Sequence, residues 1–102
     1  MNDAPIEIDW AAVVLYTPID GRHRWTGNCE HYVAGELFGP AAGLAICRYE
    51  GQAGFYLFGC DENWGTVSDT WHETLEEAKG QAEFEYEGVS QTWLSPRGDG
   101  GV

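Results

Sequence analysis

The chain has very few basic residues. Five Lys and Arg stand against seventeen Asp and Glu in 102 residues, and the formal net charge is −12. Nucleic-acid binding needs a patch of Lys and Arg that neutralises phosphates, and anionic membranes attract the same kind of patch. The composition therefore argues against binding to nucleic acid or to a membrane, and it favours a basic protein as partner.

The chain also lacks a long apolar run and a disulfide framework. The longest uninterrupted apolar run, Trp10 to Tyr16, has seven residues, whereas a membrane-spanning helix needs about 20. The first residues carry an acid where a signal peptide has a basic region. The three cysteines are odd in number and widely spaced, which is typical of reduced thiols. We therefore expect a soluble, cytoplasmic protein.

No metal or cofactor motif is found. Cys29 and His31 are two residues apart, and Cys60, Asp61 and His72 are further donors that the fold would have to bring near. A zinc site is usually marked by two short paired spacings, such as Cys-x-x-Cys with a second pair, and none is present. We predict neither a metal site nor a cofactor.

A catalytic site is not predicted either. A nucleophilic cluster of Cys60 with Asp69 and His72 would need a positive environment that favours the thiolate. Asp61 and Glu62 directly follow Cys60 and oppose it. The chain is therefore interpreted as not being an enzyme.

The first two thirds of the chain predict strands. Two segments are apolar on both faces, which is typical of central strands. Residues 6–16 fit a strand, although a short helix from Asp9 also fits the spacing of the apolar residues. Residues 18–30 are rich in Gly, Pro and polar residues and predict a long loop. The predicted strands are 6–16, 31–38, 44–50, 55–60 and 66–71, with 44–50 and 55–60 at the centre.

One helix is predicted, over residues 75–87. Thr74 and Glu77 form a capping box at its start, and Gly88 is placed to end it. A narrow stripe of apolar residues marks its buried face: Leu75, Ala78, Ala82, Tyr86 and Val89. Residues 89–94 are expected to form a short edge strand.

The sum is an α+β fold. We predict an antiparallel meander sheet of four to five strands with one C-terminal amphipathic helix packed on it. Residues 1–94 would form a single domain, and residues 95–102 a disordered tail. The residues expected in the core are Ile46, Leu57, Trp71, Leu75 and Ala82.

Two segments carry a resemblance to known proteins. Residues 56–64 (YLFGCDENW) and 69–79 (DTWHETLEEAK) resemble small uncharacterised acidic bacterial proteins. This resemblance implies no activity and no site residues. In size and acidity the chain is also similar to bacterial immunity proteins that neutralise toxins.

The strongest site candidates are aromatic rings among carboxylates. Trp64 lies in a predicted hairpin loop, and Phe84 lies nearly opposite the apolar stripe of the helix. Glu76, Glu83 and Glu87 flank Phe84 along the helix. Exposed rings within a charged rim are typical anchors of protein interfaces. The alternative is that a neighbouring segment covers Phe84.

The leading hypothesis is therefore an acidic protein-binding module, immunity- or inhibitor-like, that engages a basic protein partner. The residues expected to bind are Trp64, Glu76, Glu83, Phe84 and Glu87. The second hypothesis is a small-molecule binder or enzyme with an aromatic-lined pocket between sheet and helix, which requires a cavity of about 300 Å3 or more. The sequence does not indicate an oligomeric state.

Overall fold

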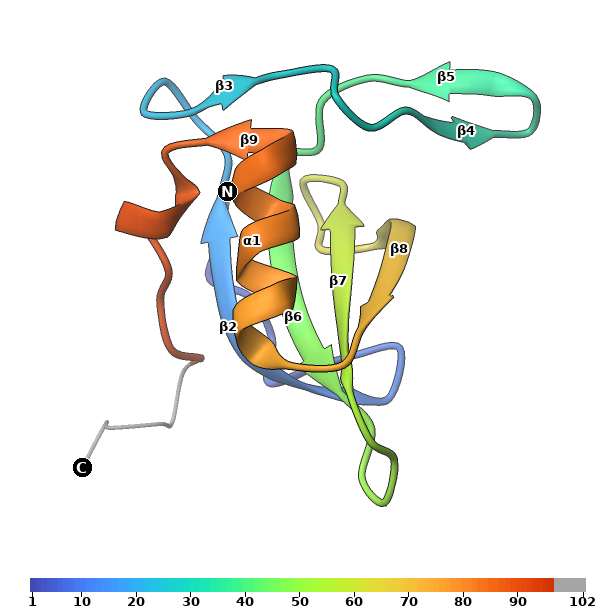
Figure 1. Cartoon of the computed structure of the whole chain (residues 1–102), viewed down its shortest axis with the longest axis vertical. Coiled ribbons are helices and arrows are strands. Elements are labelled where there is room, and N and C mark those ends of the chain that lie inside the picture. Colours follow the sequence, from blue (N-terminus) through green and yellow to red (C-terminus); the bar gives the residue numbers. More distant parts are fainter. Residues whose placement is uncertain (97–102) are drawn as a thin grey trace.

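The computed structural model describes residues 1–96 and shows an α+β fold, a curled antiparallel sheet of five strands with one helix packed against it (Figure 1). This confirms the predicted fold class. Across the sheet the strands are β1 (Glu7–Ile8), β2 (Ala11–Pro18), β6 (Gly43–Arg48), β7 (Phe55–Cys60) and β8 (Thr66–His72). The helix α1 (Leu75–Glu85) crosses one face.

The central strands β6 and β7 are apolar on both sides because both faces of the sheet are covered. Leu44, Ile46 and Leu57 pack under the helix, where Ala78 and Ala82 allow close approach. On the opposite face, Ala45, Cys47 and Phe58 join a second core that the N-terminal segment and β2 complete. Irregular pairing in β2–β6 and in β7–β8 adds local twist, which helps the sheet to curl.

The prediction that Trp71 is buried is wrong, although Ile46, Leu57 and Ala82 are buried and Leu75 is half-buried as part of the helix-side core. Trp71 pairs with Tyr56 on the face away from the helix, at the uncovered edge strand β8, and is 52% exposed. Its ring lies over Gly54, where an added Cβ would come within 2.4 Å of the indole nitrogen. Side chains alternate between the two faces of the sheet along β8, and this alternation places Trp71 on the face away from the helix.

Two predicted strands are in fact tight hairpins. Residues 6–16 divide into β1 and β2 around Asp9 and Trp10, both of which have positive φ. Residues 31–38 divide into β4 (His31–Val33) and β5 (Glu36–Phe38) around Ala34 and Gly35, which also have positive φ. Both turns leave little signal in the sequence, because only one of these four positions is a glycine, the usual mark of such a turn.

The helix begins as predicted and ends two residues earlier than expected. The Thr74 hydroxyl accepts a hydrogen bond from the Glu77 amide, and the Glu77 carboxylate accepts one from the Glu73 amide. After Glu85 the chain turns into β9 (Tyr86–Glu87), which pairs with β3 (Arg24–Trp25) from the long loop. The pairing with the loop therefore overrides helix propensity.

The predicted edge strand 89–94 is also wrong. The segment forms a short 3-10 turn, η1 (Val89–Gln91), and then touches β2 through one bridge between Leu94 and Tyr16. Gly88 precedes this turn with φ +103°, a conformation that suits glycine. Most of the predicted disordered tail, residues 97–102, lies outside the described residues. Within residues 1–96 no helix combines the length and the apolar character that crossing a membrane requires.

Candidate functional site

Phe84 lies on the outer face of α1, as the helical spacing predicts. Its side chain is 51% exposed, so neither the N-terminal segment nor residues 89–94 cover it. One turn earlier, a Cβ added to Gly80 would meet no atom within 4 Å, so the surface beside the ring is open. The ring is therefore accessible to a second molecule.

The three predicted carboxylates around Phe84 differ in how free they are. Glu76 is highly exposed, and Lys79 approaches it only at 3.9 Å. Glu83 accepts hydrogen bonds from the backbone amides of Gly88 and Ser90 at 2.9 and 3.1 Å, and so stabilises the chain after the helix. All three carry negative charge outward, but Glu76 alone is without a hydrogen-bond partner within residues 1–96.

Glu87 is held by an exposed ion pair across the β3–β9 ribbon. Both of its oxygens accept hydrogen bonds from the Arg24 guanidinium, at 2.9 and 2.8 Å. These hydrogen bonds, with the attraction of the Arg24 charge, lower the pKa of Glu87. A partner would have to compete with Arg24 for this carboxylate.

The expectation that Trp64 is exposed in its loop is wrong. The side chain is 5% exposed, and its ring packs edge-on against Tyr16 at a centroid distance of 5.5 Å. Its indole nitrogen donates to the Asn2 carbonyl at 2.9 Å. Trp64, and not the following glycine, has positive φ, so the turn directs the ring into the space that Gly43 leaves. A partner can reach only an exposed ring, so we leave Trp64 out of the proposed surface.

The hollow found between sheet and helix within residues 1–96 is very small. The hollow lined by Leu57, Thr70, Glu85 and their neighbours has a volume of about 10 Å3, roughly the space that one water molecule needs. A wider concavity of about 920 Å3 lies elsewhere, along residues 2–6 and 62–64, and is open to solvent. Tyr86 lines the small hollow and Trp64 lines the open concavity, but neither space is an enclosed cavity of about 300 Å3 between sheet and helix, as the second hypothesis requires.

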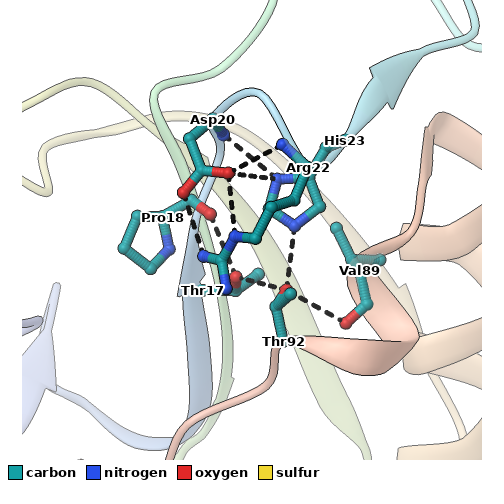
Figure 2. Close-up of polar contacts among 7 residues, drawn as sticks. All are labelled: Thr17, Pro18, Asp20, Arg22, His23, Val89 and Thr92. Carbon is teal, nitrogen blue, oxygen red and sulfur yellow. Dashed lines mark hydrogen bonds and ion pairs between the residues drawn. The ribbon is translucent and has the colours of Figure 1, made fainter.

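Asp20, His23 and Thr92 are arranged in space like a catalytic triad (Figure 2). His23 Nε2 lies 2.9 Å from Thr92 Oγ1, and His23 Nδ1 lies 3.6 Å from Asp20 Oδ1. However, His23 Nδ1 accepts a hydrogen bond from the Asp20 backbone amide at 3.0 Å. Nδ1 therefore has no proton to donate to a carboxylate, and the neutral ring carries its proton on Nε2. Such a ring cannot remove a proton from Thr92.

The His23 ring and the hydroxyls of Thr92 and Thr17 form a continuous chain of hydrogen bonds that ends at a backbone carbonyl. His23 donates to Thr92 Oγ1, which lies 2.8 Å from Thr17 Oγ1, and Thr17 donates to the Pro18 carbonyl at 3.0 Å. Thr92 Oγ1 also lies 3.3 Å from the Val89 carbonyl, a longer and weaker contact. Because these groups are buried and satisfied, the cluster fastens the residues after the helix to β2 and has no group left for chemistry.

The cluster of Cys60 with Asp69 and His72, which the sequence does not favour as a catalytic site, is not assembled within residues 1–96. Cys60 and His72 lie at opposite ends of the β7–β8 pair, about 16 Å apart at the usual rise of a strand. Burial, with a further contribution from Asp61, raises the pKa of Cys60 to about 12, and burial also raises that of Cys47. Both thiols are therefore inert core residues.

A further cluster, formed by Cys29, His31 and Glu85, combines side chains of the types that bind metal ions. The loop bends so that Cys29 and His31 meet Glu85 at the end of α1, and one donor atom from each lies within 4.8 Å of the other two. His31 Nε2 is 2.9 Å from Glu85 Oε1. Burial and the Glu85 charge raise the pKa of Cys29. The spacing of Cys29 and His31 in the sequence marks them as possible metal ligands. Glu85 could not be found from the sequence, because an acid at the end of an acidic helix is expected to face solvent.

Comparisons of the chain with known protein families, with curated proteins and with solved structures give no match. The resemblance of residues 56–64 and 69–79 to small acidic bacterial proteins stays a prediction.

Proposed function

We propose that this protein is an acidic protein-binding module that engages a basic protein, in the manner of an immunity protein or an inhibitor. The observation that carries the proposal is the exposed Phe84 ring on a helix of carboxylates, in a chain of net charge −12. An exposed aromatic ring inside a charged rim has the layout of an interface hot spot.

The two parts of this surface would have separate roles. The carboxylates of α1, among them the highly exposed Glu76, would attract a cationic cleft and speed the encounter. Phe84 would then supply the contact that loses water and slows dissociation. The open surface at Gly80 leaves room for an apolar side chain of the partner beside the ring.

The near-solid interior favours this function over a small-molecule site. The hollow under the helix is far below the several hundred Å3 that a ligand pocket needs. We place the encounter in the cytoplasm, because Cys29, Cys47 and Cys60 are all free thiols.

The test is to mix the protein with a set of basic nucleases, measuring binding and inhibition at low and at physiological salt. We expect binding that weakens as salt rises. Phe84→Ala should weaken it by more than about 1 kcal/mol, roughly fivefold in Kd, and should leave the free energy of unfolding nearly unchanged.

Tyr32→Ala is the matched control, because Tyr32 is an exposed aromatic residue on the separate β4–β5 hairpin. It should leave binding unchanged. Absence of any salt-sensitive association across the set would reject the proposal. Equal losses for the two variants would reject Phe84 as the anchor.

A further inference from the structure

The end of α1 collects negative charge without a basic side chain to balance it. Glu85 is the last residue of the helix, and the last turn contains no Lys or Arg. The backbone carbonyls there form the negative end of the helix dipole. The Glu85 side chain is only 7% exposed, and among residues 1–96 its ion-pair contact by distance is with His31, which is itself 21% exposed. Buried carboxylates in proteins are commonly paired with a positive group or coordinate a metal ion.

We propose that Cys29, His31 and Glu85 bind a single Zn2+ ion. Sulfur, imidazole nitrogen and carboxylate oxygen are the three donor types that zinc uses in proteins. Around tetrahedral zinc, such donor atoms lie about 3.3–3.6 Å apart, as bond lengths of about 2.0–2.3 Å require. In this structure the donor atoms lie within 4.8 Å of one another, with the His31–Glu85 pair at 2.9 Å. Movements of about 1 Å would bring them to these distances.

The segment that carries the donors is fixed to the helix end independently of any ion. The Thr26 hydroxyl and the Asn28 side-chain amide donate to the Phe84 carbonyl at 2.7 and 3.0 Å. The Thr26 amide donates to the Glu85 carbonyl at 3.0 Å. These bonds satisfy carbonyls that a helix leaves without partners, and they hold the following residues above Glu85.

The ligand carboxylate is also oriented. Gln81, one turn earlier, donates from Nε2 to Glu85 Oε2 at 2.7 Å and leaves Oε1 directed at His31. Partners of this kind fix the ligand geometry in metal sites. Three protein ligands leave one tetrahedral position for a water molecule. A zinc-bound thiol is deprotonated, so the Cys29 thiolate and Glu85 would together neutralise the ion.

This inference does not depend on the proposed function. The site lies at the Glu85 end of the helix and uses none of the exposed groups near Phe84 and Glu76. A failure of zinc binding would leave the protein-binding surface untouched, and the reverse also holds.

The test is titration of the full chain, first stripped with a chelator, with Zn2+ in competition with a chromophoric chelator and with Co2+ followed by absorption. We expect one Zn2+ per chain. Co2+ should give visible bands and a near-ultraviolet band from thiolate-to-metal charge transfer. That band separates the site from weak binding to the many surface carboxylates, which contain no sulfur.

The variants are Cys29→Ser and Glu85→Gln, which change only the donor atom, with circular dichroism as the check on folding. Each should weaken Zn2+ binding by at least about 100-fold, more than the loss of an orienting partner does. Cys29→Ser should also abolish the charge-transfer band. Glu30→Gln removes an exposed carboxylate beside the site and should change neither measurement. Absence of the charge-transfer band in the unmodified chain, or undiminished Zn2+ binding in either donor variant, would overturn the proposal.

Discussion

His23 and His31 come from the same long segment and both pack near the end of α1, but their surroundings differ. His23 is completely buried, and each ring nitrogen has a fixed partner of its own, the Asp20 amide and the Thr92 hydroxyl. His31 is half-buried and meets a thiol and a carboxylate, both of which can bind a cation. The difference shows that proximity to an acid and a hydroxyl does not make a histidine chemically active.

The direction of the hydrogen bonds distinguishes the two clusters. At His23 the backbone amide fixes the proton on Nε2, and every polar atom is used within the fold. At His31 the ring faces a carboxylate whose second oxygen is held by Gln81, so the first oxygen and the nearby thiol remain as donors for an ion. The first cluster is predicted to stabilise the fold, and the second to respond to metal.

The largest effect is expected for His23→Ala. Removing the ring leaves the Asp20 amide and the Thr92 hydroxyl without a partner and opens a cavity, which should lower the free energy of unfolding by about 2–4 kcal/mol. Urea denaturation followed by circular dichroism measures it. His72→Ala, which removes a half-buried ring with one hydrogen bond to Thr70, should cost less. A smaller loss for His23→Ala than for His72→Ala would contradict the structural role.

Thr92→Val should have the next largest effect. Valine keeps the shape of threonine but removes the hydroxyl that links His23 to Thr17, so a loss of about 1–3 kcal/mol is expected. Thr92→Ser keeps the hydroxyl and removes one methyl group, and should cost only about 0.8 kcal/mol. The same urea experiment compares them. If the serine variant is the less stable of the two, the packing of the methyl group, and not the hydrogen-bond chain, holds this region.

The His31 cluster can be examined without metal by a double-mutant cycle. With chelator present, His31→Ala and Glu85→Gln should show a coupling free energy of at least about 0.5 kcal/mol, because their side chains are in contact. The matched cycle pairs His31→Ala with Glu76→Gln, since Glu76 lies about 13 Å from Glu85 along the helix axis. In that cycle the effects of the two substitutions on the free energy of unfolding should be additive. Additivity in both would show that His31 and Glu85 do not interact in solution.

The smallest effect is expected for the contribution of Asp20 to stability, which depends on pH. Hydrogen bonds from the Arg22 side chain and amide lower the pKa of Asp20 to about 2. Since this pKa lies below the unfolded value of about 3.9, the contribution to stability is present above pH 4 and is lost as pH falls toward 2. Carboxyl chemical shifts measured by NMR should titrate with a midpoint near 2.

Arg22→Met removes the side-chain hydrogen bonds to Asp20 and keeps the one from the backbone amide, so the midpoint should rise part of the way toward about 3.9. A midpoint that stays near 2 in this variant would show that the Arg22 side chain is not the main cause of the low pKa of Asp20.

The elements that the sequence predicted are those with a local signal. Thr74 and Glu77 mark the helix start, and the apolar residues of β6 and β7 mark the sheet centre, because capping and two-sided burial depend on neighbours in the chain. The end of the helix was missed because Tyr86 leaves it to pair with Trp25, a partner sixty-one residues away in sequence.

The candidate sites follow the same division. The exposure of Phe84 could be predicted, since it depends on its angle within one helix. The burial of Trp64 depends on a backbone conformation unusual for tryptophan and on the space at Gly43. The burial of Glu85 depends on a loop that folds back from residues 26–31. Neither leaves a pattern in the nearby sequence.

The burial of Trp64 gives the chain a built-in optical reporter. Trp10 and Trp71 are exposed, and their emission should already resemble that of tryptophan in water, so it will change little on unfolding. Trp64 lies in the second core and is tied to the Asn2 carbonyl. In a chain with Trp10, Trp25, Trp71 and Trp93 replaced by Phe, Trp64 is the single tryptophan left. A red shift of its fluorescence would then report loosening of the sheet face away from the helix, including detachment of the first residues of the chain.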